Sequence, residues 1–370
     1  MIRSIIYKIV IIVLLSFPFS GWAYGTDAVD EHNGEETAES HHSQKKKFDP
    51  GNFIFEHIGD AYEWHVLTYK DFHLSIPLLV IAYSEDKGLN IFSSAKFHHG
   101  HETHKGFKIA QEGDYKGKLV EIMPDGSTQR PLDLSMTKNV AAIFFVLVLM
   151  LILFTSVAKK YKRDPLKAPS GFQNLTETII YFIRDEVAIP SIGQQKHERF
   201  MPYLLTLFFF ILFSNLLGLI PIPPGGANVT GNIGITGALA FLTFIMTQIS
   251  GNKFYWQETF NSPNVPWWLK FPIPLLPLIE LLGLLTKPFT LMIRLFANIA
   301  AGHIVILGFV SLIFVFGNIN VIAGYGISVL SVGFAIFLTF LEILVALIQA
   351  YIFTMLSALY LGMAVEEEHH

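Results

Sequence analysis

Two apolar runs near the C-terminus constrain the fold of this chain more than any other feature. They cover residues 275–316 and 321–364, and each has forty residues or more. An α-helix crosses a bilayer in about 20 residues, so a continuous helix of this length must be steeply tilted or curved. We therefore expect two long, steeply tilted helices that form a hairpin.

Prolines are expected to interrupt the first run only. A proline inside a helix removes a backbone hydrogen bond and clashes with the preceding turn. Four prolines, Pro272, Pro274, Pro277 and Pro288, lie in or just before the run over residues 275–316, and the last run has none. We expect them to kink or break the first long helix.

The remaining composition predicts a mainly α, polytopic membrane protein. Hydrophobic residues make up 52% of the chain and charged residues 15%, and the net charge of -4 gives no reason to expect a nucleic-acid partner. Further spans are expected at about 139–158, 203–222 and 233–251. Four basic residues between Lys159 and Arg163 follow the first of these, so the positive-inside rule places that end in the cytoplasm. Residues 174–188 are amphipathic and are expected to lie along the cytoplasmic interface.

The N-terminal third differs from the rest of the chain. Residues 1–25 have the basic start, apolar core and small-residue end of a signal peptide, with an uncleaved anchor as the alternative. Residues 26–137 then form a periplasmic extension, in which 26–50 are expected to be disordered. Strand-like segments at 64–69, 74–83 and 119–123 predict a small β-rich domain over 51–137.

Histidines are concentrated in this extension. His98, His99, His101 and His104 have a spacing that could hold a metal ion. A solvated loop with scattered imidazoles is the favoured interpretation, and no metal site is expected.

Arg294 places a permanent charge inside the first long run. A guanidinium at bilayer depth costs between about 3 and 10 kcal/mol, so it usually faces a cavity or a partner. Asn298, four residues on, shares the helix face of Arg294, whereas His303, nine residues on, falls on the opposite face. One helix would thus present two polar surfaces.

Glu342 is the single formal charge of the last run before its end, and Gln349 follows two turns later on the same face. A carboxylate in hydrocarbon needs a polar partner. Antiparallel packing of the two runs would bring His303 near it, and a His–Glu pair can pass a proton near neutral pH. A purely structural buried pair is the alternative. Asn215, inside the span at 203–222, is either a core hydrogen-bonder or a channel lining, and Glu280 lies near an interface.

The sequence LLTKPFTLMIRLFANIAAGHI, which starts at Leu284, and LEILVALIQAYIFTMLSALYL, which starts at Leu341, closely resemble subunit a of the F-type ATP synthase. The likeness covers about residues 138–365. Its specific marks are an intramembrane arginine in an RLFxN context and an acid and a glutamine seven apart in the last helix. Several bacterial members have the histidine and the acid exchanged between the positions of His303 and Glu342, so this chain resembles the mitochondrial arrangement.

The resemblance implies a stator subunit, in a bacterial inner membrane, that forms two proton half-channels against a rotor ring of small c subunits. It also implies contact with membrane lipid, a peripheral-stalk subunit b and, indirectly, the F1 catalytic sector. Arg294 would face the carboxylate of the ring, favour its deprotonation and block direct proton passage. Glu280 would lie on the cytoplasmic exit. The path from outside would be lined or supported by His303, Glu342, Asn298, Gln349 and Asn215. The positions of Gly218 and Gly283 hold polar residues in some relatives, so we assign no role to these two glycines from the resemblance.

Two other classes of function compete with this reading. A self-contained proton- or sodium-coupled transporter would also bury such residues, but internal repeats are not apparent. A membrane enzyme is disfavoured, because no nucleotide-binding glycine loop, paired-histidine metal motif or nucleophile elbow is seen. We expect neither a cofactor nor a catalytic site on this chain.

Overall fold

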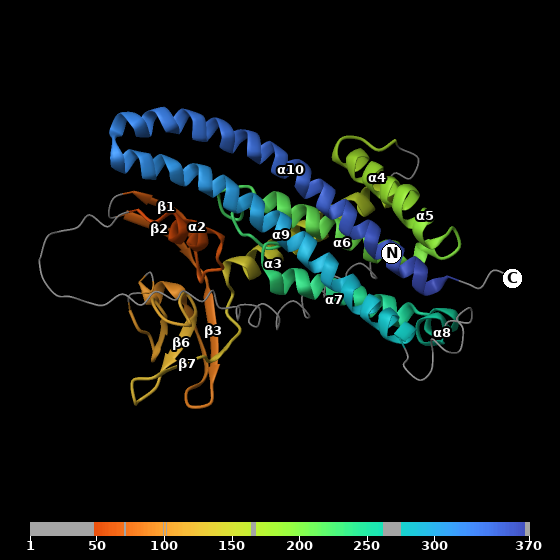
Figure 1. The fold of residues 1–370 in the computed structure, drawn as a ribbon, viewed down its shortest axis with the longest axis horizontal. Helices are drawn as coiled ribbons and strands as arrows, with labels where there is room; N and C mark the ends of the chain where they lie inside the picture. The colour runs from red at the N-terminus through yellow and green to blue at the C-terminus, as the bar shows by residue number, and fades with distance from the viewer. Residues whose placement is uncertain are drawn as a thin grey trace, which may run out of the picture.

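The computed structural model describes residues 48–69, 72–98, 100, 102–163, 168–261 and 275–366. The expected signal peptide, most of the expected disordered segment, and His99 and His101 lie outside the described residues. In Figure 1 the long helices α9 and α10 run side by side, and the β-rich extension lies toward one end of the helical part.

The described part of the extension contains the α-helix α2, a short 3₁₀ helix and three small antiparallel sheets. Their strand orders are β1-β2, β4-β3-β8 and β5-β6-β7. The elements are α2 (Pro50–Ile58), β1 (Glu63–Tyr69), β2 (Phe72–Pro77), β3 (Leu79–Ser84), β4 (Gly88–Ser93), the 3₁₀ turn η1 (Ser94–Phe97), β5 (Phe107–Ile109), β6 (Leu119–Ile122), β7 (Thr128–Gln129) and β8 (Leu132–Asp133). The segment expected as one strand over 74–83 is divided between β2 and β3, because the chain leaves one sheet for another at Leu78.

A compact apolar cluster holds the second and third sheets together. It includes Val80, Phe92, Phe97 and Phe107, all buried. Tyr62 joins this cluster, and its hydroxyl donates a hydrogen bond to the carboxylate of Asp133. Burial, with the neighbouring Asp133 charge, raises the pKa of Tyr62 well above its usual value, so the hydroxyl keeps its proton.

Within the described residues, five helices are long and apolar enough to cross a membrane: α3 (Lys138–Arg163), α6 (His197–Gly218), α7 (Ile233–Ser250), α9 (Leu275–Ile319) and α10 (Val321–Val365). In α6, 83% of the most apolar stretch is buried, against 17% in both α9 and α10. Helix α6 is therefore the centre of the bundle, whereas the long hairpin leaves most of its apolar surface for lipid or a partner. The mainly helical, polytopic fold expected from the sequence is confirmed.

Helices α9 and α10 have 45 residues each and are about 67 Å long, more than twice the ~30 Å hydrocarbon thickness. Of the expected kink or break at Pro288, the break does not occur, because α9 is one helix with Pro288 inside it. In lipid, a broken helix would leave several backbone N–H and C=O groups without partners. Keeping α9 continuous through Pro288 loses one backbone hydrogen bond, which costs less than such a break. Pro277 lies in the first turn, where its missing N–H has no helical partner, and Pro272 and Pro274 fall outside the described ranges.

Short helices surround the C-terminal end of α10, which is called its inner end from here on. They are α4 (Phe172–Phe182), the π-helical turn η2 (Ile183–Ala188), α5 (Ile189–Ile192) and α8 (Lys253–Asn261). The last carbonyls of α10 accept hydrogen bonds from other elements: Val365 O from Nζ of Lys196 at 2.8 Å, and Ala364 O from the backbone N–H of Asn252 at 3.0 Å. This end of α10 is thus capped by residues distant in sequence.

The extension contacts the membrane helices through the segment around α2. The rings of Phe48 and Phe53 lie 5.1 Å and 5.9 Å from the ring of Phe314 on α9. The carboxylate of Asp60 accepts a hydrogen bond from the backbone N–H of Asn139 at 3.0 Å, in the first turn of α3. The extension therefore packs against the end of the hairpin where α9 turns into α10 and against the start of α3.

Candidate functional site

The centre of the candidate site is a contact between the two long helices. Nδ1 of His303 on α9 lies 2.6 Å from Oε1 of Glu342 on α10, with the side chains 16% and 5% exposed. Either group can be the donor. A protonated Nδ1 of the imidazole can donate to the ionised carboxylate, or a protonated carboxyl group can donate to an unprotonated Nδ1. The contact therefore fits a proton on either partner, and the proton can pass between the two groups across this hydrogen bond without a change of side-chain position.

A glycine gives Glu342 the space it occupies. A Cβ atom on Gly302 would lie 2.6 Å from Oε1 of Glu342 and 2.9 Å from its Cδ. The carboxylate therefore packs directly against the α9 backbone beside His303. Its second oxygen, Oε2, is buried and has no hydrogen-bond partner among the described residues.

Asn215 on α6 belongs to a neighbouring polar group that includes the loop after α6. Its Oδ1 accepts a hydrogen bond from Oγ1 of Thr230 at 2.5 Å. In the part of the chain that the structure describes, Nδ2 of Asn215, both side-chain polar atoms of Asn228 and Oγ of Ser214 are buried without a partner. Such unsatisfied atoms are costly in a dry interior, which indicates a place for water.

Gly218 connects this group to His303. A Cβ on Gly218 would lie 3.7 Å from Nε2 of His303 and 3.2 Å from the carbonyl oxygen of Ala227. Gly218, at the end of α6, thus lies close both to the loop over 219–232 and to Nε2 of His303. Sequence reasoning missed Asn228 and Thr230, although the run NVTGN in this connection is unusually polar for its surroundings.

Arg294 and Asn298 lie on another face of α9. Leu291, Leu295 and Ile299 form the buried stripe, whereas Arg294 is half-buried and Asn298 is exposed. Arg294 forms no ion pair with any other described residue. The structure therefore keeps the arginine apart from the His303–Glu342 pair and leaves it at the edge of an exposed apolar surface.

The two remaining predicted residues have different environments. Gln349 on α10 is 6% exposed and lies on the buried side together with Glu342. Glu280, near the inner end of α9, is exposed.

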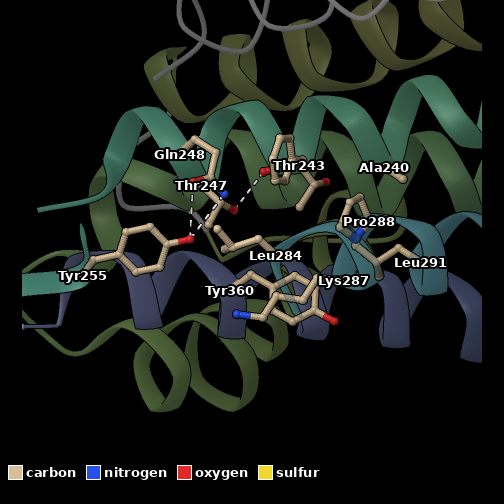
Figure 2. A pocket seen from close by; sticks show the side chains of 11 residues that line it. Ala240, Thr243, Thr247, Gln248, Tyr255, Leu284, Lys287, Pro288, Leu291 and Tyr360 are labelled. Atoms are coloured by element: carbon tan, nitrogen blue, oxygen red, sulfur yellow. Dashed lines mark hydrogen bonds between the residues drawn. The ribbon is translucent and has the colours of Figure 1, made fainter. Parts of the chain in front are cut away.

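A second group of polar side chains lies between α7, α8, α9 and α10, near the C-terminal end of α10. It lines a small pocket of about 10 Å³, which is room for about one water molecule. Figure 2 shows Tyr255 and Gln248 turned toward each other, and their side chains hydrogen-bond at 3.2 Å. Lys287 lies with its Nζ 5.6 Å from the ring centre of Tyr360. Polar groups thus continue from α7 to α10 around this pocket, which sequence reasoning did not identify.

The histidines of the extension do not form a metal site in the described residues. No group of three or more His, Cys, Asp or Glu side chains there could hold a metal ion. Nε2 of His98 lies 3.6 Å from the carboxylate of Glu102, and both side chains are about two-thirds exposed. This is a solvated surface pair of small energetic value.

Two family models match the chain. The model for the ATP synthase A chain matches residues 140–362, and a domain of unknown function, DUF8433, matches residues 53–137. The first covers all five long helices, and the second covers the described extension.

Curated relatives agree with the first match. The chain is 44% identical to ATP synthase subunit a of Chloroherpeton thalassium over 245 residues, which are 64% of this chain and 69% of the relative. It is 45% identical to that of Chlorobium phaeobacteroides over 284 residues, 73% of this chain and 79% of the relative. For Myxococcus xanthus the identity is 40% over 258 residues, 69% and 79% of the two chains. From the matched helices and these identities, the chain belongs to the ATP synthase A chain family, subunit a of the F-type enzyme.

Proposed function

We propose that this chain is the membrane stator subunit that conducts protons past a rotor ring and so couples proton flow to rotation and ATP synthesis. Its partners are a ring of small c subunits, subunit b of the peripheral stalk, membrane lipid and, indirectly, the F1 sector. The observation that carries the proposal is the buried contact between His303 and Glu342, together with Arg294, which is half-buried on the same helix as His303 and has no ion-pair partner among the described residues.

The outer half-channel includes His303, Glu342 and the polar group of Asn215 and its loop. Protons move along hydrogen bonds, so a path needs polar atoms that water can join. Oε2 of Glu342 and Nδ2 of Asn215 are buried and open to such partners, and the His303 ring lies between Glu342 and the loop. Two further polar residues support this path. Gln349 lies on the buried side of α10, and Asn298 lies on the exposed face of α9.

Arg294 acts on the rotor rather than on this path. A permanent charge lowers the pKa of a carboxylate within ~4–6 Å by about one to three units. A ring carboxylate arriving beside Arg294 would therefore release its proton. Because a guanidinium does not give up its own proton at accessible pH, Arg294 also prevents protons from passing directly between the half-channels.

The cytoplasmic half-channel is assigned to the inner pocket. Its lining combines hydroxyl, amide and ammonium groups from four helices, and Glu280 is exposed near the same end of α9. Glu280 would then deliver protons to the cytoplasmic surface.

Substitution of Arg294 tests this function. Arg294→Ala and Arg294→Lys should each abolish ATP synthesis driven by an acid pulse in proteoliposomes while the complex still assembles. Arg294→Ala should also allow passive proton leak from vesicles stripped of F1. Near-normal synthesis by an assembled Arg294→Ala complex would remove the basis of the proposal.

The orientation in the membrane is also part of the proposal. The cationic end of α3, with Lys160, Lys162 and Arg163, faces the cytoplasm, so the extension is periplasmic and the C-terminus is cytoplasmic. An amine reagent that does not cross membranes should label Lys116 from the periplasmic side only. Mass spectrometry of the mature protein should find an N-terminus near Tyr24, and an intact Met1 would contradict signal-peptide cleavage.

A self-contained transporter, the alternative function, is not favoured by the family match. Isolation of the chain from native membranes separates the two, because a stator co-purifies with c subunits and F1 whereas a transporter is isolated without them.

A further inference from the structure

The extension makes its most buried polar contact with the loop over residues 219–232. Nε1 of Trp64 donates a hydrogen bond to the carbonyl oxygen of Gly225 at 2.9 Å, and the contact is buried. Trp64 is 7% exposed and packs in the same apolar cluster as Ala227 and Val229 of this loop. A residue of the extension therefore forms part of the core of the membrane domain.

The loop that Trp64 contacts is held from both sides. On one side Gly225 accepts the Trp64 hydrogen bond, and on the other the carbonyl of Ala227 faces Gly218, beside Nε2 of His303. Gly225 has no room for a side chain, since a Cβ there would lie 2.3 Å from the carbonyl oxygen of Ile220. The backbone of this loop is thus tightly positioned between the extension and the candidate proton path.

The same loop carries the polar groups nearest the path. Thr230 hydrogen-bonds to Asn215, and Asn228 is 3% exposed with both polar side-chain atoms free of partners among the described residues. A shift of the loop by about 1 Å would break the Thr230–Asn215 contact, because hydrogen bonds weaken steeply with distance.

We infer that Trp64 is a positioning residue for proton conduction: through Gly225 it holds the 219–232 loop in the conformation that lines the outer half-channel. The extension therefore takes part in proton entry. Packing of Phe48 and Phe53 on Phe314 steadies the segment that carries Trp64. This inference rests on the proposed function, and Trp64 itself transfers no proton.

Thiol labelling tests the position of the loop directly, because the chain has no cysteine of its own. Val229→Cys places one thiol on a loop residue that is 1% exposed. In the assembled complex, this thiol should react slowly with a water-soluble maleimide. Adding Trp64→Phe, which removes the N–H donor and keeps an aromatic ring, should speed labelling roughly 3- to 10-fold, as expected for the loss of one buried hydrogen bond. Tyr83→Phe, which removes an exposed hydroxyl of the same extension, is the matched control and should leave the rate unchanged.

A second experiment tests the effect on function. It measures proton-driven ATP synthesis as a function of outer pH, at equal amounts of assembled complex. Trp64→Phe should lower the rate several-fold and displace its dependence on outer pH, and Trp64→His, which retains a ring N–H, should recover part of both. Labelling within twofold of the parent, or fast labelling with an unchanged synthesis rate and pH profile, would overturn the inference. Failure of both Trp64 variants to assemble would overturn it too, by making Trp64 a folding residue.

His303→Ala, measured in the same membranes, distinguishes failure of the proposed function from failure of the positioning role of Trp64. Normal synthesis in His303→Ala would count against the proposed function, whereas a strong loss there with normal synthesis in Trp64→Phe would count only against the positioning role.

Discussion

His303 and Glu342, which are 39 positions apart in the sequence, share a 2.6 Å contact that leaves one oxygen of the carboxylate unpartnered among the described residues. A buried carboxylate that loses its only protein partner keeps its desolvation cost without compensation. We therefore expect His303→Ala and Glu342→Ala each to lower proton-driven ATP synthesis by tenfold or more. The exchanged double variant, His303→Glu with Glu342→His, should recover more activity than either single variant.

Acid-pulse synthesis in proteoliposomes, normalised to assembled complex, measures these effects. Wild-type rates in both alanine variants would refute a role for the pair.

Gly302 is predicted to be sensitive to substitution because it leaves room for the carboxylate of Glu342. The methyl group of Gly302→Ala would lie 2.6 Å from Oε1 of Glu342, so the carboxylate must move away from His303. We expect a several-fold loss of synthesis with a smaller loss of stability. Gly317→Ala, on the same helix with open space around the added methyl group, is the matched control. Equal rates for the two variants would show that Glu342 tolerates displacement.

Gly362 is predicted to control stability. A Cβ there would lie 1.8 Å from the backbone carbonyl oxygen of Ser191, and a backbone atom cannot move aside as a flexible side chain can. Gly362→Ala should therefore separate α5 from α10 and destabilise the protein by about 1–3 kcal/mol or more. Thermal inactivation of the detergent-solubilised complex measures this effect, with Gly326→Ala, which meets open space, as the control.

Asp60 is predicted to make the contact between the extension and α3 depend on pH. Burial raises the pKa of Asp60 above its usual value, although the hydrogen bond from Asn139 opposes the shift. A pKa raised in the folded state means that the contribution to stability is fully present below about pH 4 and is lost as the pH rises through the folded-state pKa. Asp60→Asn keeps an acceptor for Asn139 and removes the titration.

Hydrogen exchange measures this dependence. After correction for intrinsic rates, protection at the start of α3 should fall with rising pH in the parent protein and stay level in Asp60→Asn. A parallel fall in both proteins would contradict the prediction.

The pattern of the sequence was sufficient to predict the long helices and the meeting of His303 with Glu342. Both depend on rules that act along one segment or between two adjacent segments: the length needed to cross a bilayer, and the polar partner that a buried acid requires. The sequence left open whether Pro288 kinks or breaks the first long helix, and it does not break α9. A proline removes one backbone hydrogen bond, whereas an interrupted helix would leave several backbone groups without partners in the bilayer.

Contacts between segments far apart in the sequence could not be predicted in this way. The Trp64–Gly225 hydrogen bond joins residues 161 positions apart, and no period or charge pattern links a tryptophan in a β-rich extension to a loop between two spans. The pocket between α7, α8, α9 and α10 was missed for the same reason. Its threonine, glutamine, tyrosine and lysine residues do not stand out in the sequence, and they lie together only because four helices meet there.

The capping of α10 by Lys196 and Asn252 has a mechanical consequence. A rotor that turns against the hairpin exerts a sideways force on it. A rod fixed at one end bends far more under such a force than a rod fixed at both ends. The inner end of α10 is clamped by these two residues, and the outer part of the hairpin is braced where Phe48 and Phe53 press on Phe314 of α9. The helix pair that receives the reaction force is therefore supported at both ends, and its midsection can keep its place while the ring moves past it.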